Sequence, residues 1–325
     1  MPTVISTFAG CGGSSLGYKW AGFRELLAIE WETNAVETFK LNFPEVPVWQ
    51  RDIKTVTARE IFDFTGIKKG ELDVFDGSPP CQGFSTAGKR KVNDSRNDLF
   101  KEYSRLIKEL QPKVFIMENV SGMIKGKMRG KFLEILSELK SCGYNVKCKL
   151  MNAMWYDVPQ SRERLFFIGV RNDLNVEPSF PEPSNKVTNS NIVKGSPTDG
   201  LNGKFLLLTG KTSELIKELK QGERLSDVYE RKNKGKHAYF AFGRLDLNKP
   251  ARTIIKNSAG LIHWFENRTL TIGEYKRIAS FPDEYKFIGT FSDALQRIGN
   301  AVMPKMMYHI AKHIKDNCLS TMERK

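Results

Sequence analysis

The chain has few cysteines and lacks the features of an exported or membrane-bound protein. Its 325 residues include five cysteines, an odd number, and no two of them form a Cys-x-x-Cys pair. This scarcity argues against a disulfide framework and against a bound metal, and it favours reduced thiols inside a cell. The N-terminus lacks the cationic start and apolar core of a signal peptide. No apolar run approaches the ~18 residues that a membrane span requires, so we expect a cytoplasmic protein with no membrane partner.

Acidic residues are also in short supply. The chain has 37 Asp and Glu against 51 Lys and Arg, a net charge of +14. Such a charge favours a polyanionic partner, with nucleic acid as the first candidate. A basic surface that serves only solubility is the alternative, and charge alone does not separate the two. Hydrophobic residues make up 40% of the chain, which is enough to bury the core of a folded protein.

The first half of the chain alternates short apolar runs with helical patterns. The runs cover residues 4–8, 25–31, 72–75 and 114–117. Such alternation predicts an α/β fold with a doubly wound, mostly parallel sheet. Ligands bind beyond the carboxyl ends of the strands in such sheets. Polar or unusual residues follow those ends: the glycine turn at 10–13, Glu30, Asp52, Cys81 and Glu118.

The pattern changes in the second half of the chain. Residues 177–236 are rich in Pro, Asn, Ser, Gly and Lys, with one clear helical stretch. We therefore predict a catalytic domain over residues 1–171 and a smaller, irregular domain over residues 172–268. Residues 269–325 should return to the catalytic domain and end in a helix.

The glycine turn at residues 10–13 follows a strand and opens a helix. Glycines allow a ligand to approach the backbone at a helix N-terminus. Ser15 stands where a dinucleotide-binding motif needs its third glycine, which disfavours a nicotinamide oxidoreductase. Glu30 could accept hydrogen bonds from ribose hydroxyls, and Asp52 from an adenine amino group. The pattern favours an adenosine-type cofactor over a purely structural turn.

Three further sites carry groups suited to catalysis. Cys81 follows two prolines in a rigid polar loop, unlike an inert buried cysteine, and the basic stretch after it suits a lid that closes on DNA. Glu118 ends an apolar strand and is a candidate proton donor; a solvated strand-end acid is the alternative. Arg162 and Arg164 stand two apart on an extended segment, so their side chains should point the same way and orient a substrate.

The order of these motifs resembles one enzyme family. FAGCGG, PPCQ, ENV, QSRER and QRIGNAV follow one another as in cytosine-C5 DNA methyltransferases of the bacterial and phage type. Two more stretches, RLDLNKPARTII and RTLTIGEYKRIASFP, also resemble that family. The resemblance covers nearly everything except the variable middle of the chain. It implies a Rossmann-like fold and an enzyme that uses S-adenosylmethionine and releases S-adenosylhomocysteine.

The resemblance also implies roles for single residues. Cys81 would be the nucleophile, Glu118 would engage cytosine N3 and the amino group, and Arg164 would contact the cytosine carbonyl. Arg162 would support this catalytic set. The implied cofactor-binding residues are Phe8, Gly10, Cys11, Gly13, Glu30, Trp31, Asp52, Ile53, Pro80, Leu99, Asn300 and Ala301.

Double-stranded DNA is the implied partner, with the target cytosine flipped out of the helix. The residues expected to contact DNA are Ser85, Lys89, Arg90, Lys91 and Arg96 in the lid, and Arg231, Lys232, Lys234, Lys236, His237, Tyr239 and Arg244 in the smaller domain. For residues 231–236, phosphate contact is favoured over base readout. We expect a monomer, with a cognate restriction endonuclease as a functional partner in a restriction–modification system.

Two alternatives share the scaffold. A tRNA cytosine-C5 methyltransferase usually carries a Cys-Phe-Thr motif in its target domain, and this chain has none. A catalytically inactive DNA-binding regulator would have no need for Cys81, Glu118 and Arg164 together. We therefore favour the active DNA enzyme.

Overall fold

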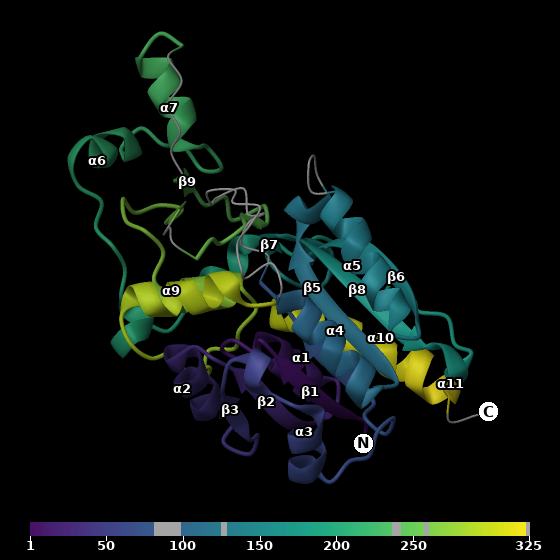
Figure 1. The fold of residues 1–325 in the computed structure, drawn as a ribbon. Helices are drawn as coiled ribbons and strands as arrows, with labels where there is room; N and C mark the ends of the chain where they lie inside the picture. Colours follow the sequence, from purple (N-terminus) through teal and green to yellow (C-terminus); the bar gives the residue numbers. More distant parts are fainter. Residues whose placement is uncertain (81–98, 125–128, 236–241, 257–259, 323–325) are drawn as a thin grey trace. The chain divides into compact units, whose positions relative to one another are not determined.

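Among the residues that the computed structural model describes (1–80, 99–124, 129–235, 242–256 and 260–322), seven strands form one sheet (Figure 1). Their order is β3-β2-β1-β4-β5-β8-β6. The parallel strands are β1 (Thr3–Thr7), β2 (Arg24–Glu30), β3 (Val48–Gln50), β4 (Val74–Gly77) and β5 (Val114–Val120). The predicted mostly parallel α/β fold is confirmed.

The sheet has a topological switch point at β1, which lies between β2 and β4. Ligands bind beside such points, at the carboxyl ends of the strands. Two long strands complete the other side: β8 (Glu163–Arg171) is antiparallel to β5, and β6 (Tyr144–Asn152) is antiparallel to β8. Because β8 runs antiparallel to β5, it begins beside the carboxyl end of β5, where Val120 pairs with Arg164.

Helices cover this sheet. They are α1 (Gly13–Trp20), α2 (Thr33–Asn42), α3 (Ala58–Thr65), α4 (Leu99–Leu110), α5 (Arg129–Ser141), α10 (Pro304–Ile314) and α11 (Ser320–Met322). Helix α3 begins with a capping box of Thr57 and Glu60, and ends at Gly66 in the left-handed conformation. None of the helices in the described part of the chain is long and apolar enough to cross a membrane.

A hydrophobic core, called the main core below, lies on one face of the sheet and includes residues of β1, β2, β4, β5, β6 and β8. Phe75 and Phe115 of the central strands pack there with residues of α3, α4 and α5. Tyr103 of α4 places its hydroxyl 3.0 Å from the Phe75 carbonyl and 2.9 Å from the Ile116 carbonyl. A Cβ atom at Gly77 would lie 2.5 Å from the Tyr103 ring, so only glycine fits at the end of β4.

The chain divides into two units. The sheet unit comprises Met1–Asn152, Glu163–Glu182 and Met306–Lys325, and the small unit comprises Ala153–Arg162 and Pro183–Lys305. The small unit has its own core, formed by Ile216, Leu219, Leu225, Val228 and Ile262. Its longer helices are α6 (Gly210–Ile216), α7 (Leu225–Lys232), α8 (Ile272–Ile278) and α9 (Phe291–Asn300); its strands are β7 (Gln160–Ser161), β9 (Gly243–Arg244), β10 (Ala251–Arg252) and β11 (Leu261–Ile262).

These boundaries differ from those predicted by composition. Residues 153–162 belong to the small unit because β7 pairs with β10 and because the Gln160 amide bonds to Ile254 and Ile278. Most of the predicted returning segment also stays there, since α8 packs against the short helices Ser190–Val193 and Gly200–Gly203. The part that lies in the sheet unit is Met306–Lys325.

Candidate active site

The glycine turn lies where the sequence predicts, between β1 and α1. Gly10 and Gly12 have φ values of 55° and 91°, in the left-handed region that favours glycine. Phe8 also has a positive φ, of 53°, a conformation that costs a non-glycine residue free energy and that collects at functional sites. A Cβ atom built at Gly10 would meet no atom within 4 Å. Open space over the backbone is what a ligand at this turn requires.

Glu30 is the last residue of β2, and its carboxylate bonds to the backbone of the glycine turn. Its Oε2 accepts the Gly10 amide at 2.8 Å, and its Oε1 accepts the amides of Trp31 and Glu32, each at 2.9 Å. A carboxylate has about four acceptor positions, so Oε2 keeps capacity for a ligand hydroxyl. Beside it, the Trp31 side chain is 71% exposed. An exposed indole at a strand end presents a flat face on which a planar ring can stack.

Five more of the predicted cofactor residues belong to the sheet unit. Asp52 follows β3 and caps a short helix (Ile53–Thr55), where its Oδ1 accepts the Lys54 amide at 3.0 Å. Ile53 is buried in the main core, and Leu99 packs against it at the start of α4. Two further predicted residues, Cys11 and Pro80, are buried and half-buried.

Glu118 and Arg164 form the central charged pair of the site. The Arg164 Nε lies 2.8 Å from Glu118 Oε1, and the two side chains are 15% and 12% exposed. The pairing of β5 with β8 explains this, because Val120 stands opposite Arg164. The Nη1 group of Arg164 donates to the Glu163 carbonyl at 2.7 Å. Burial lowers the pKa of Arg164 while Glu118 opposes that shift, and an arginine stays charged in such surroundings.

Asn119 is a site residue that the sequence prediction did not include. Its side chain is buried, and its Nδ2 donates to the Pro79 carbonyl at 3.1 Å while its Oδ1 accepts the Val120 amide at 2.9 Å. Asn119 therefore ties the end of β5 to the segment just before Cys81. Its signal was available, since the amide stands inside the ENV motif and can both donate and accept. Cys81 and the predicted lid contacts Ser85, Lys89, Arg90, Lys91 and Arg96 lie outside the described residues.

A buried carboxyl lies beneath the glycine turn and was also missed. Asp76 of β4 is 3% exposed and accepts a hydrogen bond from the Tyr18 hydroxyl at 3.2 Å. Ser15, also on α1, donates to Glu25 at 3.0 Å. Burial raises the pKa of Asp76 to about 8, and the nearby Glu25 adds to that rise. These contacts anchor α1, whose N-terminus carries the turn.

We expect Asp76→Asn to change how stability depends on pH. Because the folded state raises the pKa of Asp76 from its ordinary 3.8 to about 8, the fold favours the protonated form. Its contribution is present at low pH and is lost as pH rises toward 8, by up to about 1.4 kcal/mol per pH unit. Asparagine keeps the acceptor for Tyr18 without the buried charge. The stability advantage of the variant over the parent should therefore grow between pH 5 and pH 8.

Urea unfolding at several pH values measures this difference. Asp63→Asn, on an exposed side chain of α3, is the matched control and should give a constant offset. Parallel pH profiles for Asp76→Asn and the parent would show that the Asp76 carboxyl is already ionised in the folded protein.

Arg162 lies in the small unit and differs from Arg164 in its surroundings. Its side chain is 1% exposed, and it donates to the carbonyls of Ile254 at 3.0 Å, Gly299 at 2.8 Å and Ala301 at 3.2 Å. Arg162 therefore joins main-chain segments of the small unit, and its predicted supporting role stays a prediction. Of the two predicted cofactor residues here, Asn300 is exposed at the end of α9 and Ala301 is half-buried.

The prediction that Arg244 contacts DNA is wrong. Its side chain is 7% exposed, and each of its five N–H groups has an acceptor inside the small unit. The acceptors are the carbonyls of Leu219, His263, Glu266 and Ile216 and the side chain of Asn267. Arg244 is therefore a structural residue that joins α6 to the turn after β11.

The remaining predicted DNA contacts of the small unit that the structure describes are all exposed to solvent. Arg231 and Lys232 are exposed at the end of α7 and form ion pairs with Glu223 and Glu218. Exposed pairs of this kind are worth about 0–1 kcal/mol, so a phosphate could replace the acid. Lys234 is exposed as well. The predictions for Lys236, His237 and Tyr239 concern positions outside the described residues.

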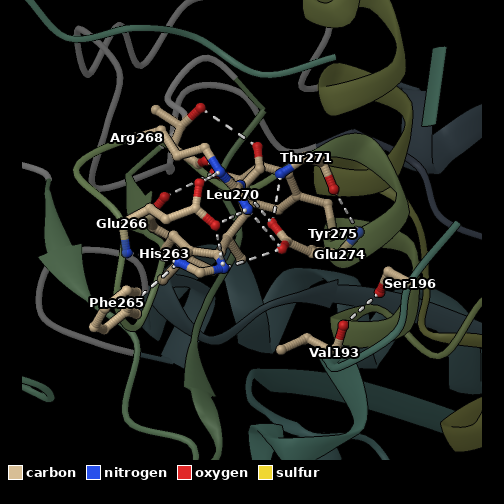
Figure 2. A network of polar contacts seen from close by, with 12 residues as sticks. Val193, Ser196, His263, Phe265, Glu266, Arg268, Leu270, Thr271, Glu274 and Tyr275 are labelled. Atoms are coloured by element: carbon tan, nitrogen blue, oxygen red, sulfur yellow. Dashed lines mark hydrogen bonds and ion pairs between the residues drawn. The ribbon is translucent and has the colours of Figure 1, made fainter. Parts of the chain in front are cut away.

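A polar network fixes the turn after β11 (Figure 2). The His263 Nδ1 accepts the amides of Phe265 at 3.2 Å and Glu266 at 2.8 Å, so the ring proton lies on Nε2. Burial lowers the pKa of His263, which favours this neutral form. Arg268 bonds to Glu266 and to both oxygens of Glu274, which forms the capping box of α8 with Thr271. His263 is thus a structural histidine of the small unit.

Comparisons with known proteins agree with this arrangement. The profile of the family described as C-5 cytosine-specific DNA methylase matches residues 2–316. The type II methyltransferase M1.HphI of Haemophilus parahaemolyticus is 36% identical over 327 residues, covering 96% of this chain and 86% of that protein. The type II methyltransferase M.FnuDI of Fusobacterium nucleatum is 35% identical, covering 96% and 94%.

Solved structures agree in fold. A structure described as a prophage-encoded DNA modification methyltransferase from E. coli superposes with a TM-score of 0.76 and 26% identity, covering 98% of this chain and 99% of that one. Spodoptera frugiperda DNMT2 has the same fold, with a TM-score of 0.69 at 20% identity and coverage of 99% and 100%. The chain therefore belongs to the C-5 cytosine-specific DNA methylase family and is a DNA cytosine-C5 methyltransferase.

Proposed function

We propose that this enzyme flips one cytosine out of a short recognition sequence in duplex DNA and methylates its C5 atom from S-adenosylmethionine. The observation that carries the proposal is the cluster of Glu118, Asn119 and Arg164 near the carboxyl end of β5. Glu118 and Arg164 form an ion pair there, and Asn119 bonds to the carbonyl of Pro79, two residues before Cys81. An acid, a cation and the segment that precedes the nucleophile are therefore joined at the end of β5. A regulator without catalysis would have no use for a buried, oriented charge pair.

The residues around the glycine turn fit S-adenosylmethionine. The open space over Gly10 suits its methionine part, the remaining acceptor capacity of Glu30 suits a ribose, and the exposed Trp31 suits adenine stacking. The rest of the set, Phe8, Cys11, Gly13, Asp52, Ile53, Pro80, Leu99, Asn300 and Ala301, follows from the resemblance. When bound, the cofactor supplies an electrophilic methyl group.

The protein groups would make the base reactive. Cytosine C5 is a weak nucleophile, and addition of the Cys81 thiolate at C6 turns the ring into an enamine with electron density at C5. Glu118 would donate to N3 and accept from the amino group, and Arg164 would hold the carbonyl oxygen. Methyl transfer to C5 would leave S-adenosylhomocysteine. Removal of the C5 proton by a base, for which an ordered water is suited, and departure of the thiolate from C6 would then restore the aromatic ring. The cysteine is regenerated unchanged.

The small unit and the basic segment after Cys81 would supply the contacts with DNA. Flipping a base costs a few kcal/mol, and phosphate contacts can offset that cost. Arg231, Lys232 and Lys234 are exposed cations suited to phosphates. We further propose a monomer that acts in the cytoplasm and protects DNA from a cognate restriction endonuclease.

The test is transfer of labelled methyl to unmethylated duplex DNA and to bulk tRNA, followed by bisulfite sequencing of the DNA. We expect label in DNA at one short recurrent sequence. Label only in tRNA would overturn the choice of DNA and retain the chemistry of Cys81 and Glu118. Label in neither substrate, with the cofactor still bound, would favour the regulator.

A further inference from the structure

We propose that Arg162 is a positioning residue for cofactor binding, and that it acts by holding the main chain on both sides of Asn300. The inference rests on the proposed function, because the cofactor contact of Asn300 is part of that proposal. The resemblance assigns a cofactor contact to Asn300 but does not say what fixes its position. We infer that Arg162, a residue distant in the sequence, fixes the main chain at Asn300.

Arg162 caps the C-terminal end of α9. The last carbonyls of a helix have no partner within it, and the final helical bond here runs from the Ala301 amide to the Arg297 carbonyl. The Nη2 group of Arg162 donates to the carbonyls of Gly299 and Ala301, which flank Asn300. A buried cation at this end of a helix also interacts favourably with the helix dipole.

A second set of contacts fixes the same turn from another side. The Nη1 group of Arg162 donates to the Ile254 carbonyl, and the Ile254 amide donates to Gln160. A Cβ atom on Gly299 would lie 2.7 Å from the Lys256 nitrogen, so the two backbones are in direct contact. Arg162 therefore clamps two segments of the small unit that already touch.

The effect on Asn300 follows from this clamp. Gly299 is buried and Ala301 is half-buried, and both of their carbonyls accept bonds from Arg162, whereas Asn300 itself is exposed. An exposed side chain on a fixed main chain is preorganised for a ligand and loses little freedom on binding. Lysine at position 162 would keep the charge, but one ammonium cannot reproduce the fork that reaches three carbonyls. Arg162→Lys should therefore loosen the turn without removing Asn300.

The experiment is a double-mutant cycle on the full chain, with the Kd for S-adenosylmethionine measured by calorimetry in the absence of DNA. Arg162→Lys and Asn300→Ala should each raise the Kd by about tenfold, because a displaced contact loses most of its value. If Arg162 acts through Asn300, the double variant should bind no more weakly than the weaker single variant. Additive effects, or an unchanged Kd for Arg162→Lys, would overturn the inference.

Arg277→Lys is the matched control. Arg277 also holds a turn of the small unit through main-chain carbonyls, those of Ile192, Lys194 and Gly195. Its loss should lower the melting temperature and leave the Kd unchanged; a raised Kd would mean that any loosened turn affects binding, against the proposal. If Arg162→Lys does not fold, Gly299→Ala replaces it, because its Cβ would push the same two segments apart.

The cycle also separates this inference from the proposed function. Coupled Kd values in an enzyme that methylates no DNA would support the role of Arg162 and contradict the substrate assignment. A parent protein that does not bind S-adenosylmethionine would overturn both.

Discussion

Cys81→Ser should reduce methyl transfer by on the order of 10³-fold or more while DNA and cofactor still bind. A thiolate is available near neutral pH, whereas a serine hydroxyl remains protonated and adds poorly to the cytosine ring. The substitution changes one atom, so we expect the variant to fold like the parent. The measurement is single-turnover methyl transfer to duplex DNA, with binding followed separately by a gel-shift titration.

Cys148→Ser is the control for this result. Cys148 is half-buried on β6, and burial raises its thiol pKa, so it is poorly suited to nucleophilic attack. Its variant should keep the parental rate. Normal turnover by Cys81→Ser would remove the nucleophile from the proposed mechanism, and loss of DNA binding would show that the substitution affects more than the chemical step.

Glu118→Gln should slow the same step by about 10²-fold or more. Glutamine cannot donate a proton to N3, and it leaves the half-buried Arg164 without its charged partner. Removing one partner of such a pair costs more than removing both, because the remaining charge stays desolvated. We therefore expect Glu118→Gln combined with Arg164→Met to be less impaired than the product of the two single effects.

Glu163→Gln is the matched control, because its side chain is exposed and the substitution keeps the main-chain carbonyl that accepts the Arg164 bond. It should leave single-turnover transfer near the parental rate. A near-parental rate for Glu118→Gln would instead assign proton donation to another group. Additive effects of Glu118→Gln and Arg164→Met would mean that the two side chains do not act as a pair.

The sequence by itself determined the alternating fold, the glycine turn at the switch point, and the positions of Glu30 at the end of β2 and Glu118 near the end of β5. These features follow from local patterns: apolar runs form strands, and parallel strands end at one edge of the sheet. The link from Asn119 to Pro79 was within reach too, since both residues lie in motifs that the sequence displays.

The tertiary structure alone decided which arginines are available to a ligand. Arg162, Arg164 and Arg244 look alike in sequence, yet Arg164 pairs with Glu118, whereas Arg162 and Arg244 are buried on carbonyls from distant segments. It also decided that residues 269–305 belong to the small unit. The physical reason is the same for both. A buried guanidinium needs hydrogen-bond acceptors and an apolar helix face needs a packing surface, and both can come from distant parts of the chain. The Ala301 carbonyl, for example, lies 139 positions from Arg162, so no local pattern reveals the contact.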